Sequence, residues 1–273
     1  MAGIFRFNKK SPGDSTDQVR LVLLAAFPKS ASQHMLYRIE SGFRDTHTIR
    51  AKIDLGYGHN FLSKTTLLEH IDPGKINILY GHYPLNHANR DVLDTFAGKQ
   101  AIVLIRSLPD VVVSYADHMR KNSWGPLDWG VEGCIECHPG FADITTAGQH
   151  DFIIRFILPW YLRFLSSWLA YRDTLPVKIV TFEDQTLHAG DTLSEIGEYL
   201  QLETVPDREL AADGGVVKVN FNQGISGRGR ELLSAAQLEE IARLTDTAGL
   251  QRYASLCRYL THGPQAMAPD TGL

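Results

Sequence analysis

The stretch VRLVLLAAFPKSASQHML, residues 19–36, decides the fold of this 273-residue chain. Its first half is a continuous apolar run rich in branched side chains, which is typical of a strand buried on both faces of a parallel sheet. The run ends at Pro28, and a helical pattern begins near Ser32. The stretch therefore predicts a strand, a sharp turn and a helix in direct succession.

Three further apolar runs repeat this pattern along the chain: KINILYG at 75–81, QAIVLIR at 100–106 and VKIVTF at 177–182. Stretches with helical periodicity begin near Pro109, Asp151, Gly190 and Ser234. Pro109 suits the first turn of a helix, where its missing N–H has no partner to lose. Ser234 and Gln237 have the spacing of a capping box. The alternation of strands and helices predicts a three-layer α/β/α fold around a central parallel sheet.

Length and composition are those of one folded domain. Apolar residues make up 44% and charged residues 21% of the chain, which excludes a collagenous, coiled-coil or largely disordered protein. A chain of 273 residues is at the upper edge of what one domain contains. We expect that domain at residues 18–262, between poorly ordered ends at 1–17 and 263–273.

Charge and hydropathy exclude two kinds of partner. Lys and Arg number 27 against 31 Asp and Glu, so the net charge of -4 gives no general attraction to nucleic acid or to anionic membranes. The apolar stretch 19–27 is too short to cross a membrane, and 152–171 is interrupted by Arg155 and Arg163. The N-terminus lacks the apolar segment of a secretory signal, and three cysteines build no disulfide framework. We therefore predict a cytoplasmic protein without membrane insertion.

The turn after the first strand carries groups that bind anions. The carboxyl ends of parallel strands are where ligands bind, because the following helix offers free N–H groups there. Here Lys29 supplies a positive charge, small Ala31 allows close backbone approach, and the side-chain donors are Ser30, Ser32 and Gln33. The glycines of a Walker A loop are missing, which argues against ATP with magnesium. The alternative interpretation is a solvated turn with a helix cap.

The strand at 100–106 ends in a second candidate anion site. Arg106 lies at its carboxyl end, and Ser114 follows in the second turn of the helix that Pro109 begins. A guanidinium and a hydroxyl placed in this way can converge on one phosphate group. Taken alone, an arginine that ends a strand is more often a surface residue.

The two segments, in this order, resemble the sulfotransferases that use 3'-phosphoadenosine-5'-phosphosulfate (PAPS). The family's 5'-phosphosulfate loop has the form PKSGTTW and is matched by residues 28–34. Its 3'-phosphate motif, RNPxDxxxSxxxxxR, is matched at Arg106, Asp110, Ser114 and Arg120. The resemblance implies a P-loop-like phosphosulfate-binding loop at residues 29–33 and a 3'-phosphate bound by Arg106 and Ser114.

Two more landmarks of this family lie where the resemblance places them. His82 in YGHYPLN matches the histidine of the family's T-H-x-P stretch. Phe182 in VTFEDQ matches the aromatic residue of the YEDL stretch that faces adenine. The resemblance thus implies that His82 belongs to the catalytic centre and Phe182 to the nucleotide site.

The segment NQGISGRGR, residues 222–230, resembles the family's C-terminal RKGxxGDWK segment, with Gly224 in register. The Arg-Lys pair that begins the family segment is replaced here by Asn222 and Gln223. Because Arg228 and Arg230 follow a few residues later, we expect one of them to supply the missing charge at the 3'-phosphate.

The resemblance implies transfer of the sulfuryl group of PAPS to a hydroxyl or amine of a small acceptor, with adenosine 3',5'-bisphosphate (PAP) as the product. His82 would act as the general base and Lys29 would stabilise the leaving phosphate. A sulfuryl group carries a single negative charge, so no metal is expected. The alternatives are a noncatalytic PAP or nucleotide-binding protein and a P-loop-type nucleotide kinase.

The sequence gives fewer indications of the residues that bind the acceptor. Aromatic residues and the carboxylates Asp128, Glu132 and Glu136 in the loop 122–150 favour a polar or cationic small molecule. The string CIECH contains Cys134, Cys137 and His138, which are three ligands where a structural zinc site needs four. We expect an acceptor-side loop there without metal. The sequence leaves a homodimer open and offers no site for nucleic acid.

Overall fold

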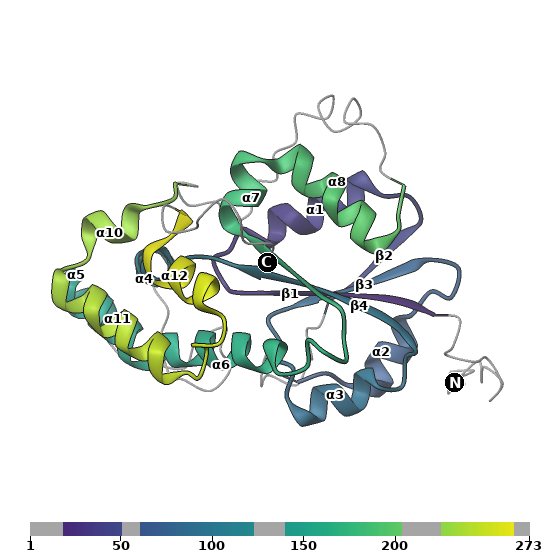
Figure 1. Ribbon diagram of the computed structural model, residues 1–273, viewed down its shortest axis with the longest axis horizontal. Coiled ribbons are helices and arrows are strands. Elements are labelled where there is room, and N and C mark those ends of the chain that lie inside the picture. The colour runs from purple at the N-terminus through teal and green to yellow at the C-terminus, as the bar shows by residue number, and fades with distance from the viewer. Residues whose placement is uncertain (1–18, 51–60, 123–139, 204–224, 265–273) are drawn as a thin grey trace, which may run out of the picture.

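The computed structural model describes residues 19–50, 61–122, 140–203 and 225–264. Its five strands form one parallel sheet in the order β2-β3-β1-β4-β5 (Figure 1). The strands are β1 (Arg20–Ala26), β2 (Thr46–Arg50), β3 (Ile76–Gly81), β4 (Gly98–Ile105) and β5 (Val177–Thr181). The four runs recognised in the sequence are all strands of this sheet, so the predicted parallel α/β fold is confirmed.

Strand β1 is the central strand, and its side chains alternate between two cores. Leu21 and Leu23 belong to the apolar cluster on one face of the sheet, and Val22 and Leu24 belong to the cluster on the other. None of these four side chains is more than 1% exposed. A strand that is covered on both faces must be apolar throughout, which is why the sequence reads as a continuous run rather than an alternating one.

Helices cover both faces of the sheet (Figure 1). On one face, α1 (Ser32–Gly42) and α8 (Ala189–Leu200) contribute to the smaller core cluster. The larger cluster on the other face contains residues of α2 (Lys64–His70), α3 (His87–Leu93), α4 (Leu108–Asn122), α6 (Leu158–Leu169), α11 (Ala235–Thr247) and α12 (Ala254–His262). The remaining short helices are η2 (Phe141–Asp143), α5 (Thr146–Phe152), α7 (Phe182–Leu187) and α10 (Arg228–Leu232). The three-layer arrangement matches the prediction.

Two elements differ from the sequence-based expectation. The strand β2 has the sequence THTIR, in which only Ile49 is described as buried, and it is an edge strand beside β3. Such a short, mostly polar strand carries no continuous apolar run, so its pattern is weak. The helix expected near Asp151 begins at α5, where the Thr145 hydroxyl caps the first turn by accepting the Gly148 N–H. The capping box of Ser234 and Gln237 is confirmed at the start of α11.

The helical stretch Thr146–Leu169 is long and apolar enough to cross a membrane by length and composition. It consists of α5, the π-helical segment η3 (Ile153–Ile157) and α6. In the folded chain 61% of the most apolar 18 residues of this stretch are buried. Ile153, Leu158 and Phe164 lie in the larger core cluster. This stretch is therefore a core helix of the domain. The terminal segment 1–17, predicted to be poorly ordered, lies outside the described residues.

Candidate functional site

The turn between β1 and α1 has an unusual backbone. Lys29 has a φ of 68° and Ala31 a φ of 60°, so two residues with side chains occupy the left-handed region within three positions. This conformation costs a non-glycine residue about 1–2 kcal/mol, and such strain gathers at functional sites. Ala31 also caps α1, because its carbonyl oxygen accepts the N–H groups of His34 and Met35 at 3.0 and 3.1 Å. We refer to this turn, residues 28–33, as the phosphate loop, after the sequence motif that it resembles.

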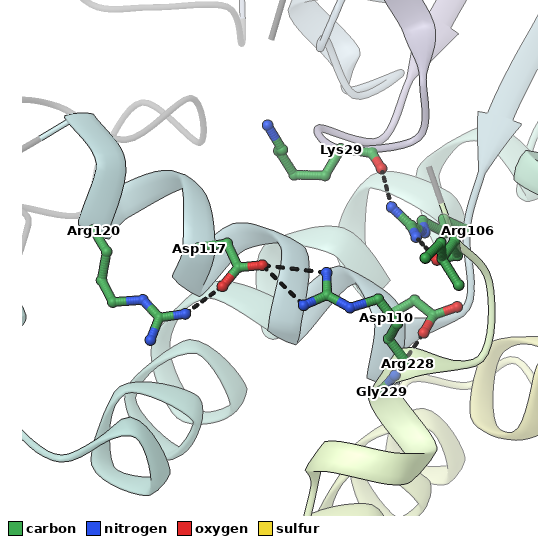
Figure 2. Close-up of polar contacts among 8 residues, drawn as sticks. Lys29, Arg106, Asp110, Asp117, Arg120, Arg228 and Gly229 are labelled. Carbon is green, nitrogen blue, oxygen red and sulfur yellow. Dashed lines mark hydrogen bonds and ion pairs between the residues drawn. The ribbon is translucent and has the colours of Figure 1, made fainter. Parts of the chain in front are cut away.

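Three consecutive carbonyl groups of the phosphate loop are held by side chains from other elements. The Tyr161 hydroxyl donates to the Pro28 carbonyl at 3.1 Å, and the Gln185 amide donates to the Ser30 carbonyl at 3.1 Å. The guanidinium of Arg106 donates to the Lys29 carbonyl, also at 3.1 Å (Figure 2). All three donors are buried. With its carbonyl oxygens turned toward the protein, a loop of this kind can direct its N–H groups at an anion.

The hydroxyl groups of the phosphate loop are already engaged. Ser30, which is fully buried, donates to the Phe27 carbonyl at 2.7 Å and so stabilises the turn itself. Ser32 and Gln33 both contact the Tyr80 hydroxyl at the end of β3. The structure therefore places all the loop residues that the sequence singled out on one turn, and it adds Tyr80 to them.

Arg106 joins the phosphate loop to two other parts of the chain. Besides the Lys29 carbonyl, its guanidinium donates to the Ile225 carbonyl at 2.8 Å and lies 3.9 Å above the centre of the Phe182 ring. Arg106 is only 6% exposed, and this burial lowers its pKa. Its Nε–H finds no hydrogen-bond partner within the described part of the chain. The ring of Phe182 is 2% exposed, and its contact with adenine stays a prediction.

The ammonium group of Lys29 lies in an electropositive environment beside α4. Burial and the nearby cations Arg106 and Lys121 lower the pKa of Lys29 to about 8, while the carboxylate of Asp117 raises it. His118 faces the same environment: burial and the charge of Lys29 lower its pKa to about 4, so its imidazole is neutral at pH 7. The phosphate loop and α4 therefore share one electrostatic site.

His82 is tied to the end of β1. Its Nδ1 lies 2.8 Å from the carbonyl oxygen of Ala26, the last residue of that strand and two residues before the phosphate loop begins. A carbonyl can only accept, so Nδ1 carries the proton and the lone pair of the neutral ring is at Nε2. This is the tautomer that a general base needs.

The segment after residue 224 is attached to α4 by a carboxylate. Asp110 accepts the N–H of Gly227 at 2.8 Å and that of Gly229 at 2.7 Å. A Cβ on Gly229 would lie 2.1 Å from the carbonyl carbon of Pro109, so only glycine fits at this close approach. The sequence singled out Asp110 as a motif position but gave it no role, because its partners are more than a hundred residues away.

Two further carboxylates also hold the segment after residue 224. The sequence analysis assigned no role to either of them. Glu183, 5% exposed, accepts hydrogen bonds from the hydroxyl groups of Ser226 and Tyr259, and its charge acts on Arg106. Asp117 lies between two arginines: Arg228 contacts it at 3.2 Å, and Arg120 binds its other oxygen (Figure 2). No sequence motif signals either role, since both are set by contacts between distant segments.

The arginines near the C-terminus have different surroundings. Arg228 pairs with Asp117, whose carboxylate also acts on Lys29, so it belongs to the site. Arg230 is exposed and donates to the His262 carbonyl at 3.4 Å, at the end of α12. Ser114 is 4% exposed on α4, one turn after Asp110. Gly224 lies outside the described residues.

Within residues 19–50, 61–122, 140–203 and 225–264, no group of three or more His, Cys, Asp or Glu side chains could hold a metal ion. Cys134, Cys137 and His138 lie outside these ranges, so the prediction of an acceptor-side loop without metal is not tested at those positions.

The sequence matches no protein-family model, and no curated protein matches it either. The fold, by contrast, is similar to solved structures over most of the chain. The crystal structure of mouse sulfotransferase SULT7A1 complexed with PAP has a TM-score of 0.63 at 16% identity, over 90% of this chain and 91% of that one. Retinol dehydratase in a complex with retinol and PAP has a TM-score of 0.56 at 14% identity, over 84% and 82%. Retinol dehydratase with androsterone and inactive cofactor PAP has a TM-score of 0.55 at 12% identity, over 84% and 81%.

Proposed function

We propose that this chain, which has the fold of the sulfotransferases, transfers the sulfuryl group of PAPS to a hydroxyl or amine of a small acceptor. One observation carries the proposal: the Arg106 guanidinium, at the end of β4, binds the carbonyl oxygen of Lys29 in the phosphate loop. The two turns that resemble the 5'- and 3'-phosphate sites therefore form one cradle, although 77 positions separate them. A nucleotide with phosphate groups at both ends fits such a cradle.

At the 5' end, the N–H groups of the phosphate loop, residues 29–33, would bind the phosphosulfate with Lys29, Ser32 and Gln33. At the 3' end, Arg106 and Ser114 would bind the phosphate with Arg228, which must then leave Asp117. The buried Nε–H of Arg106 supports this assignment, because an unsatisfied buried donor is costly unless a ligand accepts from it. We assign the remaining charge to Arg228 rather than Arg230, since Arg228 pairs with Asp117 beside Lys29, whereas Arg230 is exposed and donates to the His262 carbonyl.

The chemistry follows from three side chains. His82 takes the acceptor's proton on Nε2 as the acceptor oxygen or nitrogen attacks sulfur in line. The new bond to sulfur forms while the bond between sulfur and the bridging oxygen of PAPS breaks. Lys29 offsets the negative charge that develops on that oxygen as PAP leaves. Ser30 supports the step indirectly by holding the turn that presents Lys29. The single charge of a sulfuryl group makes a metal ion unnecessary.

The acceptor that we propose is a polar or cationic small molecule, because carboxylates occur in the loop 122–150. Most of this loop lies outside the described residues. The two retinol dehydratase structures contain retinol and androsterone, so the acceptor that we propose differs from the molecules in those structures. We propose a cytoplasmic location for the protein and leave its oligomeric state open.

Two measurements test the proposal. Isothermal titration calorimetry should detect binding of PAP and none of ATP with magnesium; the reverse result would favour a nucleotide kinase and overturn the proposal. Labelled PAPS, incubated with a panel of hydroxyl and amine acceptors, should then give a product with the mass of an added sulfuryl group. If PAP binds but no acceptor in a broad panel is modified, the chain is a noncatalytic PAP-binding protein instead.

A further inference from the structure

Tyr80 is a buried tyrosine that contacts both polar side chains at the start of α1. Its hydroxyl oxygen lies 2.9 Å from the Ser32 hydroxyl and 2.7 Å from the Gln33 amide nitrogen. The side chain is 5% exposed and comes from β3, the neighbour of β1 in the sheet. Two donors of the phosphate loop are thus joined to each other through a residue to which the sequence analysis gave no role.

The chemistry of these groups sets the direction of the hydrogen bonds. An amide NH₂ can only donate, so Gln33 donates to the Tyr80 oxygen. The bond between Tyr80 and Ser32 can run either way. When an anion takes the Ser32 proton, the Ser32 oxygen can only accept from its other neighbour, and the Tyr80 hydroxyl must be the donor. A chain of hydrogen bonds then runs from Gln33 through Tyr80 and Ser32 to the anion. Hydrogen bonds aligned in this way strengthen one another.

We propose that Tyr80 is a positioning residue for the 5'-phosphosulfate, which it orients by making the Ser32 hydroxyl a donor to the anion. This inference rests on the proposed function, because it takes the ligand of the phosphate loop to be the 5' end of PAPS. It assigns no contact between Tyr80 and the substrate.

The ring of Tyr80 has a separate role in the structure. It packs edge to face against the His82 imidazole, with 6.1 Å between the ring centres, and it lies in the smaller core cluster. Tyr80→Phe keeps this packing and removes only the hydroxyl. The variant therefore separates the hydrogen-bond chain from the placement of His82.

The test compares two ligands in wild type and Tyr80→Phe by isothermal titration calorimetry. PAP carries both phosphates, whereas adenosine 3'-phosphate lacks the 5' group. Loss of a hydrogen bond that serves a charged ligand should weaken PAP binding about tenfold. The affinity for adenosine 3'-phosphate should change less than about twofold, because the phosphate loop is not used. With PAPS as substrate, KM should rise about tenfold while kcat changes little.

Tyr83→Phe is the matched control. Tyr83 is also buried, lies three residues away, and donates its hydroxyl proton to the Leu79 carbonyl at 2.8 Å, so its variant loses a buried hydrogen bond elsewhere. It should leave both affinities unchanged. In a Ser32→Ala background, Tyr80→Phe should cost less than about threefold, because the group through which Tyr80 acts is already missing.

The outcomes separate the two proposals. If wild type binds no PAP, the proposed function fails and this inference fails with it. If wild type binds PAP and Tyr80→Phe binds it equally well, only the role of Tyr80 is refuted. Equal weakening of PAP and adenosine 3'-phosphate, or full additivity with Ser32→Ala, would also refute it, since either result indicates general damage to the fold.

Discussion

The phosphate loop at residues 28–33 and the C-terminal segment 225–230 are both held close to Arg106, but by opposite chemistry. In the loop, side-chain donors hold three backbone carbonyl groups. In the C-terminal segment, the carboxylates of Asp110 and Glu183 hold backbone N–H groups and a hydroxyl. In the loop the Ser30 N–H donates to the Phe27 carbonyl at 3.3 Å, within the turn itself. In the segment the N–H groups of Gly227 and Gly229 serve its attachment to Asp110. In the proposed site, the segment therefore binds an anion chiefly through the side chain of Arg228.

The largest effect is expected in the loop region, where the chemistry is proposed to occur. His82→Ala and Lys29→Ala should each lower turnover by at least about a hundredfold, because general-base assistance and a placed cation each contribute at least that much. PAP binding, measured by calorimetry, should survive better in His82→Ala, since Lys29 is proposed to contact the phosphate as well. Near-normal turnover of His82→Ala would remove this residue from the mechanism.

A large effect on stability is expected in the C-terminal segment. Gly229→Ala places a methyl group against the backbone of Pro109, so α10 must move away from α4. Overpacking of this kind costs about 1–3 kcal/mol, which should lower Tm by several degrees in thermal unfolding.

The control for Gly229→Ala is the reverse exchange in the phosphate loop. Ala31→Gly replaces a residue in the left-handed region, where glycine is not strained, and should change Tm little because the relieved strain and the added freedom of the unfolded chain offset each other. An equal decrease of Tm in both variants would mean that the two regions are packed equally tightly, which would contradict this expectation.

A moderate effect separates the two C-terminal arginines. Arg228→Met should weaken PAP binding about tenfold, because it removes the charged hydrogen bond that we propose to the 3'-phosphate. Arg230→Met is the matched control, since Arg230 is exposed and bound to His262, and it should change the affinity less than about twofold. The opposite ranking would assign the 3'-phosphate to Arg230.

The smallest effect is expected in the pH dependence of kcat/KM. In the proposed mechanism Lys29 must be protonated to offset the leaving charge. Because its pKa is lowered to about 8, kcat/KM for PAPS should fall as the pH rises above about 8. Asp117 raises the pKa of Lys29, and Asp117→Asn should therefore move this midpoint to lower pH. A pH profile of kcat/KM for both proteins measures the shift. A midpoint that does not move, or moves upward, would contradict the placement of Asp117 beside Lys29.

Linkage gives a further expectation for the free energy of unfolding. The folded-state pKa of Lys29, about 8, lies below the ordinary lysine value, so the unfolded chain binds more protons between these two values. The stability contributed by this group should therefore rise with pH above about 8. Denaturant titrations of wild type and Lys29→Met across this pH range measure the difference, and a wild-type contribution that falls with pH would contradict the burial of the ammonium group.

The sequence by itself determined the parallel sheet, because a doubly covered strand such as β1 must be apolar at every position, and it determined the phosphate loop, whose groups are contiguous at residues 28–33. Only the tertiary structure decided what meets Arg106. The carbonyl groups of Lys29 and Ile225, the ring of Phe182 and the charge of Glu183 come from three separate segments, since Phe182 and Glu183 are neighbours at the start of α7. The edge strand β2 and the hydroxyl of Tyr80 also escaped prediction. A site whose groups are close together in the sequence forms a motif that can be recognised. A contact between distant segments has no fixed sequence spacing, so it cannot be predicted in this way.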